Sequence, residues 1–111
     1  MIGLNSLVHI NKDEIESLFN EAKGHDLVSQ YELGLRYYHG YDVKQNYREA
    51  VKWWRKAAED GLVFAQYALG TCFLLGKGVK KSKSTATKWL WEAIEHGLFE
   101  VVDIQKDLGK K

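Results

Sequence analysis

Four histidines and one cysteine are the side chains of this chain that could support nucleophilic or metal chemistry. No two histidines have the spacing that places two metal ligands on one helix face, and no second cysteine joins them. Cys72 lies among apolar neighbours, which indicates a buried and inert thiol. We therefore expect no catalytic residues, no cofactor and no metal, and we keep a small enzyme only as a distant alternative. The histidines are His9, His25, His39 and His96.

The charge balance says little in favour of a nucleic-acid partner. The chain has 111 residues, 28% of them charged, with a formal net charge of +1. A single domain with this balance is not typical of chains that bind nucleic acid or membrane surfaces. No apolar run approaches the roughly 20 residues of a membrane-spanning helix. We expect a cytoplasmic protein with no membrane role, and we interpret its clusters of lysine and arginine as solvated helix faces.

The elements that would position any site are set by an internal repeat of 36 residues. No gap is needed to align the two copies, and such a period is typical of stacked helical units. Repeat 1 covers residues 26–61 and repeat 2 covers residues 62–97. Stacked repeats mostly present a binding surface and lack a catalytic pocket. The matching residues include Gln30, Tyr31, Leu33, Gly34, Ala50 and Ala57, which recur as Gln66, Tyr67, Leu69, Gly70, Ala86 and Ala93.

Each repeat has the start and stop signals of two helices. Asp26, Asn46 and Ser82 stand where N-caps are expected, and Glu49 follows Asn46 in a capping-box arrangement. Leu62 occupies the corresponding position at the start of repeat 2 and has no side-chain acceptor. Glycines end the helices, with Gly40 and Gly76 closing the first helix of each repeat and Gly61 and Gly97 the second.

The two ends of the chain resemble partial repeats. We expect an irregular N-terminal arm over residues 1–11 and a capping helix over residues 12–25, because Asn11 followed by Glu14 is a helix-start signal. Shifted by 36 residues, Ala22 aligns with Ala58, so this helix corresponds to a lone second helix. Residues 98–111 are expected to form a C-terminal capping helix and tail. A polar outer side is typical of such terminal units.

Two motifs carry a resemblance to a known family. Residues 65–70 read Ala-Gln-Tyr-Ala-Leu-Gly, and residues 49–61 read Glu-Ala-Val-Lys-Trp-Trp-Arg-Lys-Ala-Ala-Glu-Asp-Gly. With the turn at residues 76–79, they resemble the Sel-one-like repeat family, a branch of the tetratricopeptide-like helical repeats. The resemblance implies an all-α, right-handed α/α superhelix of two full helix-turn-helix repeats, with a capping helix at each end. It also implies a protein-binding adaptor without catalytic residues.

The first helix of each repeat is apolar on two sides, and the second side is the candidate binding surface. A helix of this kind is either buried on both sides or offers one side to a partner. We expect a concave, aromatic stripe that binds a partner, with an acidic rim at the C-terminal end. The alternative is that neighbouring helices close over the stripe. The stripe residues are Val28, Tyr31, Leu35, Tyr38, Phe64, Tyr67, Thr71 and Leu74, and the rim residues are Glu100, Asp103 and Asp107.

Three further residues differ from a simple surface pattern. Gly34 and Gly70 lie inside helices, where glycine costs about 1 kcal/mol relative to alanine, so we expect a neighbouring helix to approach closely there. Trp91 stands on the expected solvent face, where its counterpart is Arg55. It is either covered by the C-terminal tail or a second contact site. A second contact site there would allow the protein to form a homo-oligomer.

The sequence therefore predicts a protein whose partner is another protein. One hypothesis is an adaptor that binds a peptide or helix through the stripe. The alternative is a bacterial immunity protein, a cognate inhibitor that neutralises a partner toxin domain. The repeats indicate where the partner would bind without indicating which partner it is.

Overall fold

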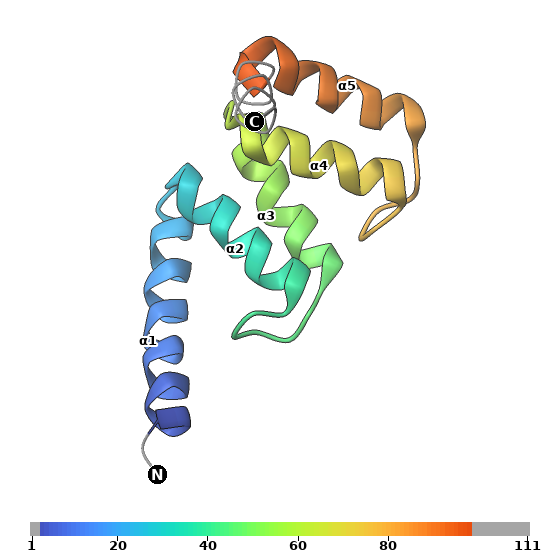
Figure 1. Cartoon of the computed structure of the whole chain (residues 1–111). Coiled ribbons are helices and arrows are strands. Elements are labelled where there is room, and N and C mark those ends of the chain that lie inside the picture. Colours follow the sequence, from blue (N-terminus) through green and yellow to red (C-terminus); the bar gives the residue numbers. More distant parts are fainter. Residues whose placement is uncertain (1–2, 99–111) are drawn as a thin grey trace, which may run out of the picture.

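Consecutive helices stack on one another along the chain (Figure 1). The computed structural model describes residues 3–98, and no strand occurs in that range. Each helix packs mainly against the next one in sequence, which confirms the predicted all-α helical-repeat solenoid. The elements are α1 (Gly3–Lys23), α2 (Leu27–His39), α3 (Tyr47–Glu59), α4 (Val63–Leu75), α5 (Lys83–Ala93) and the short π-helical segment η1 (Ile94–Leu98).

The N-terminal helix is longer than the sequence predicted. Helix α1 begins at Gly3, so the irregular arm expected over residues 1–11 is wrong for residues 3–11, and Asn11 lies inside the helix. The physical reason is continuity, because neither glycine nor proline interrupts the chain between Gly3 and Gly24. An asparagine inside a helix costs well under 1 kcal/mol relative to alanine, so its capping preference does not force a helix end. Of the expected C-terminal capping helix and tail over residues 98–111, residues 99–111 lie outside the described range.

The predicted N-caps form the expected hydrogen bonds. Asp26, Asn46 and Ser82 each accept the backbone N–H three residues further on, at 2.8, 3.1 and 3.2 Å. Leu62 makes no side-chain cap, as its residue type required. The helices of both repeats therefore begin where the sequence indicated. Helix α4, which has no side-chain cap at its N-terminus, depends on its packing against neighbouring helices.

The two turns that join the helices of a repeat are built alike. Gly40 and Gly76 adopt left-handed backbone conformations, with φ of 76° and 73°, and close α2 and α4. The N–H of Asn46 then donates to the Tyr37 carbonyl at 2.8 Å, so Glu49 does not complete the expected capping box. An equivalent bond, of 3.0 Å, joins the N–H of Ser82 to the Phe73 carbonyl. The turn is therefore tied back to the helix that precedes it.

A buried glutamine joins each repeat to the helix before it. The side-chain amide of Gln66 donates to the Ala58 carbonyl at 3.1 Å, which links α4 to α3. Gln30 donates to the Ala22 carbonyl at the same distance and links α2 to α1. Because both joints use equivalent residues, α1 occupies the place of a second helix of a preceding repeat. This agrees with the alignment of Ala22 with Ala58.

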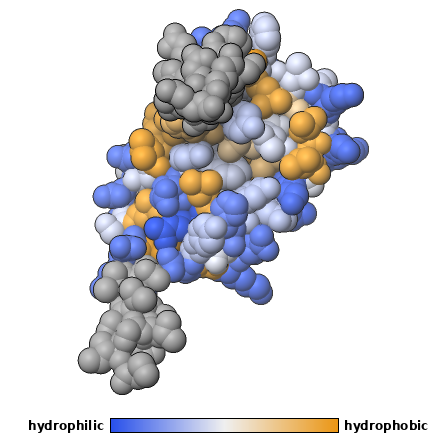
Figure 2. Space-filling view, in the orientation of Figure 1, coloured by the Kyte–Doolittle hydropathy of each residue, from blue (hydrophilic) through white to orange (hydrophobic). Residues whose placement is uncertain are grey.

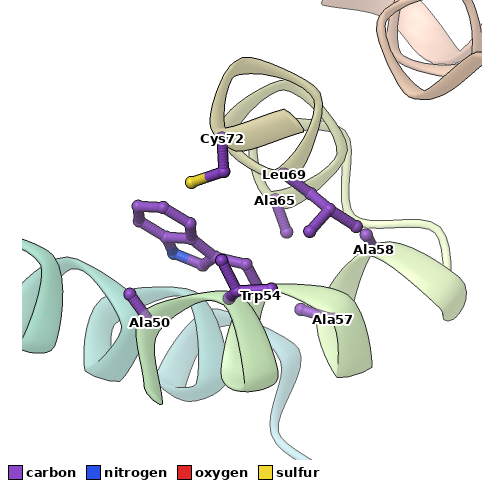
Figure 3. Packing of buried hydrophobic residues seen from close by; sticks show 8 residues of the cluster. Ala50, Trp54, Ala57, Ala58, Ala65, Leu69 and Cys72 are labelled. Carbon is purple, nitrogen blue, oxygen red and sulfur yellow. The ribbon is translucent and has the colours of Figure 1, made fainter. Parts of the chain in front are cut away.

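The main core lies between the two repeats. Small side chains let α3 and α4 approach closely around one tryptophan, and Figure 3 shows Cys72 above the indole and the alanines beside it. The two helix-interior glycines explain the close approach within each repeat. A Cβ on Gly34 would overlap the Trp54 indole, and one on Gly70 would lie 2.9 Å from Leu90 Cδ2. The buried cluster contains Ala50, Val51, Trp54, Ala57, Ala58, Ala65, Leu69 and Cys72.

Candidate functional site

A hollow of about 200 Å³ lies between α2 and α4, and the Trp54 side chain forms part of its lining. Its walls come from equivalent faces of the first helix of each repeat, and its floor comes from α3. No charged side chain lines it, and four of its lining residues are aromatic. The lining residues are Tyr31, Leu35, Tyr38, Trp54, Tyr67, Ala68, Thr71 and Cys72.

Helical spacing places the walls of the hollow. Tyr31, Leu35 and Tyr38 follow one another at four and three residues, so they share one face of α2. Tyr67 and Thr71 occupy the same positions on α4, because the helices are copies 36 residues apart. The Thr71 hydroxyl donates to the Tyr67 carbonyl at 2.9 Å, so it is already used within the helix.

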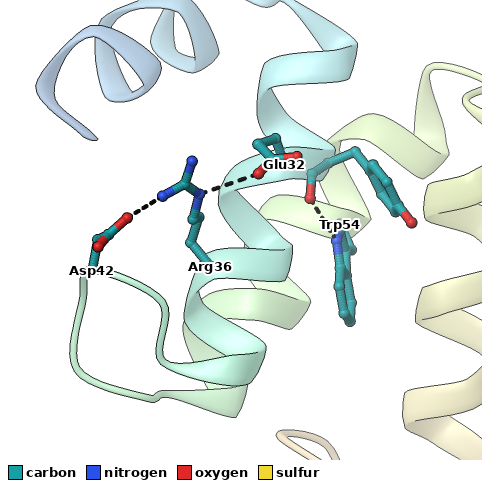
Figure 4. A network of polar contacts seen from close by, with 5 residues as sticks. Glu32, Arg36, Asp42 and Trp54 are labelled. Atoms are coloured by element: carbon teal, nitrogen blue, oxygen red, sulfur yellow. Dashed lines mark hydrogen bonds and ion pairs between the residues drawn. The ribbon is translucent and has the colours of Figure 1, made fainter. Parts of the chain in front are cut away.

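The floor is held in place by hydrogen bonding and aromatic packing. The Trp54 indole N–H donates to the Tyr31 carbonyl at 3.0 Å, as Figure 4 shows, and Trp54 is only 3% exposed. Its ring centroid lies 5.4 Å from that of Tyr38 and 6.3 Å from that of Tyr31. A site with such a fixed floor is preformed, which limits the ordering cost of binding.

The structure brings together five of the eight predicted stripe residues around the hollow, namely Tyr31, Leu35, Tyr38, Tyr67 and Thr71. Phe64 lies beside it, with its ring 6.0 Å from that of Tyr31, and is 48% exposed. Neighbouring helices cover the stripe only in part, because Tyr67 is 50% exposed whereas Tyr31, Leu35 and Tyr38 are partly buried against the core. We keep the name "groove" for the hollow together with Phe64.

The other predicted contact residues lie away from the hollow. Val28 and Leu74 are exposed on α2 and α4 but do not line it. Trp91 lies on α5 and is 59% exposed, which leaves a large apolar side chain available for contact. The acidic rim residues Glu100, Asp103 and Asp107 lie outside the described residues.

Sequence analysis did not identify Trp54 as the floor of the groove. The repeat alignment pairs Trp54 with Leu90, and this pairing indicates only that a large apolar side chain occupies both positions. Ala68 and Cys72 were missed for the same reason. The available signal was the pairing of a helix-interior glycine, Gly34, with a tryptophan on the next helix.

Burial favours the neutral forms of two groups that line the groove, the Tyr31 hydroxyl and the Cys72 thiol. Burial, and to a smaller extent the charge of Glu32, raises the pKa of Tyr31 above its ordinary value. Burial raises the pKa of the Cys72 thiol to about 11, although the charge of Lys77 acts in the opposite direction. A protonated thiol is a poor nucleophile. The groove is therefore better suited to contact with apolar groups of a partner than to acid–base chemistry.

The charged residues of α2 are paired outside the hollow. Arg36 binds Glu32 through its Nε at 3.1 Å and also binds Asp42 (Figure 4). Among residues 12–97, no group of three or more acidic, histidine or cysteine side chains is arranged to hold a metal ion. None of the described helices is long and apolar enough to cross a membrane.

Larger hollows exist but have a different character. One of about 550 Å³ lies beside Trp89 and is lined mainly by polar and charged groups, among them Glu59, Glu92 and His96. Another, of about 450 Å³, follows the basic side of α3. On the face seen in Figure 2, apolar residues form separate patches among polar ones. The aromatic lining distinguishes the groove from these hollows, because aromatic residues dominate contact energy at protein interfaces.

Comparisons with known proteins agree with this architecture. The family model described as the Sel1 repeat matches residues 27–62 and 63–98. The chain is similar to the crystal structure of a protective antigen that is present in uropathogenic Escherichia coli strains and displays an SLR fold, with 41% identity and a TM-score of 0.71. It is also similar to a Sel1 repeat protein from Oxalobacter formigenes, with 37% identity and a TM-score of 0.74.

These matches cover most of this chain and a smaller part of the similar structures. They cover 72% and 78% of this chain, but 17% of the antigen and 36% of the Oxalobacter protein. No curated protein matches the chain in the corresponding comparison.

Proposed function

Because the chain belongs to the Sel1 repeat family, whose repeats generally mediate protein–protein interactions, we propose that it is a non-catalytic module that binds a partner protein in the groove between α2 and α4. One observation carries this proposal. Aromatic side chains line a preformed hollow with a fixed floor, and one of them, Tyr67, is 50% exposed in the free protein. Removing such surface from water on binding is favourable by about 25 cal/mol per Å² of apolar area.

The groove accepts an apolar side chain of the partner. Tyr67 and Phe64 offer accessible rings on one wall, and Tyr31 and Tyr38 form the other wall. Tyrosines at interfaces bury large areas and lose little conformational freedom, which explains their enrichment at energetic hot spots. A partner side chain inserted here would contact Trp54 without moving it.

The test compares two exposed aromatic residues at different places. Purified wild-type protein, Tyr67→Ala and Trp91→Ala are immobilised, and the proteins that each captures from a cell lysate are compared. The proposal expects Tyr67→Ala to lose the captured protein and Trp91→Ala to retain it. Circular dichroism melting of both variants checks that the fold is unchanged. Equal capture by wild type and Tyr67→Ala would overturn the groove as the binding site.

The bacterial immunity protein remains a prediction, and stoichiometry distinguishes it from the adaptor. An inhibitor is expected to form a tight one-to-one complex with a single protein, whereas an adaptor binds several short segments weakly. Self-association through Trp91 is a separate prediction. It is checked by sedimentation at increasing concentration, with loss of any dimer in Trp91→Ala as the expected sign.

A further inference from the structure

A lysine is fixed at one end of the groove. Lys77 follows Gly76, which ends α4, and its backbone N–H donates to the carbonyl of Cys72 at 3.0 Å. Its ammonium nitrogen lies 5.0 Å from the centroid of the Tyr47 ring and 5.9 Å from that of Tyr38. Tyr38 lines the hollow, so the ammonium group stands at its rim.

Within the part of the chain that the structure describes, the ammonium group of Lys77 has no acidic partner. It donates to the Tyr47 hydroxyl at 3.4 Å, and this hydrogen bond raises the pKa of Lys77, which keeps it charged at neutral pH. Among residues 3–98, no carboxylate oxygen lies within 4.0 Å of it. Glu32, on the adjacent helix α2, is already bound by Arg36.

The rest of the groove is uncharged, so Lys77 makes the electrostatic potential at the groove positive. Helix α4 contains no charged residue between Val63 and Leu75, and no charged side chain lines the hollow. A cation beside an apolar surface attracts a carboxylate more strongly than one fully surrounded by water, because the local dielectric constant is lower. The groove therefore combines an apolar hollow with one positive charge.

We propose that the groove recognises an acidic segment of its partner, in which one large apolar side chain enters the hollow and a neighbouring carboxylate pairs with Lys77. This inference rests on the proposed function. The hollow has the volume of roughly seven water molecules at about 30 Å³ each, which is room for one large side chain. Residues two apart in an extended segment lie on the same side, about 6.6 Å from each other. That separation is comparable with the 5.9 Å between the Lys77 ammonium and the Tyr38 ring.

The probe is a library of random linear peptides selected against the intact protein. Peptides that bind are expected to pair a large apolar residue with Asp or Glu on the same side. One recovered peptide is then synthesised together with its Glu→Gln or Asp→Asn version. Affinities of both are measured for the wild type, Lys77→Met, Lys77→Arg and Lys80→Met. Lys80 is the matched control, because it is an exposed cation of the same turn.

The expected result is specific to Lys77. Lys77→Met should weaken binding of the acidic peptide about two- to fivefold, the range of one exposed ion pair, and should leave binding of the amide version unchanged. Lys77→Arg should retain most of the affinity, and Lys80→Met should behave like the wild type. The preference for the acidic peptide should also decrease as salt is added.

Other results overturn one or both proposals. If the amide peptide binds as well as the acidic one, or if Lys77→Met and Lys80→Met lose affinity equally, the acidic-segment inference fails. The groove itself survives that result if Tyr67→Ala still abolishes binding. If the selected peptides bind Tyr67→Ala as well as the wild type, or if the library yields no binder, both proposals fail.

Discussion

Gly34 on α2 lies so close to the indole of Trp54 on α3 that a side chain on the glycine would overlap the ring. The contact sets the distance between these helices and places the indole N–H against the Tyr31 carbonyl. It therefore fixes the floor of the groove as well as the core of the repeat.

Substituting Gly34 by alanine should destabilise the protein. Alanine favours the helix by about 1 kcal/mol, but overpacking of a filled core costs about 1–3 kcal/mol, so we expect a net loss. Chemical denaturation measures the free energy of unfolding. Gly24→Ala is the control, because its Cβ would meet its nearest atoms at 3.5 Å, an ordinary contact. Unchanged stability in Gly34→Ala would contradict the packing argument.

Replacing His25 by glycine should stabilise the protein. His25 has a left-handed backbone with φ of 73°, and the equivalent positions hold Gly61 and Gly97. Relief of the left-handed conformation is worth about 1–2 kcal/mol and is partly offset by the greater freedom of glycine in the unfolded chain. A rise of a few degrees in the thermal midpoint is expected. Asp42→Gly, at φ of 65°, should gain less because Asp42 also binds Arg36. A lower midpoint for His25→Gly would refute the argument.

Replacing Gln30 by leucine should loosen α1 selectively. The variant loses the hydrogen bond to the Ala22 carbonyl, and a typical internal hydrogen bond contributes about 1 kcal/mol. Amide hydrogen exchange in α1 should then become about fivefold faster, while exchange in α5 stays unchanged. The equivalent change in repeat 2, Gln66→Leu, is the matched comparison and should act at the joint of α3 and α4. Uniform acceleration throughout the protein would show that the joint is not a separate unit of stability.

The Cys72 thiol should react slowly with iodoacetamide near pH 8 and rapidly after unfolding. Burial raises its folded pKa to about 11, from the ordinary value of 9.0. The raised pKa also affects stability, because above pH 9 the unfolded state loses the thiol proton more readily than the folded state. Stability of the wild type should therefore fall more than that of Cys72→Ala as the pH rises from about 9 to about 11. Parallel pH profiles for the two proteins would exclude this linkage.

The repeat pattern predicted most of the fold because caps and glycines are local signals. The hydrogen bonds of Asp26, Asn46 and Ser82 follow from residue type and position alone. The start of α1 was not predictable in this way, since a single asparagine cannot outweigh an uninterrupted helix-forming stretch. The additional residues of α1 are helical because neither glycine nor proline interrupts that stretch of the chain.

The groove was only partly predictable, because it depends on contacts between helices. Spacing along α2 and α4 identified Tyr31, Tyr38 and Tyr67, which are wall residues. The floor comes from a third helix, and its orientation is set by the hydrogen bond of Trp54 to α2. Sequence spacing within one helix does not contain that information. The position of Lys77 likewise depends on how its turn folds back to Tyr47.

The glutamine joint has a consequence for how such a chain changes its length. Since Ala22 and Ala58 present the same acceptor to the next unit, removal of residues 27–62 would place α1 directly before Gln66. The number of units can thus vary by duplication or loss without a new interface. The hollow obeys a different rule, because its two walls belong to consecutive units. One unit alone forms none, two units form one, and every unit gained by duplication creates a further place where specificity can diverge.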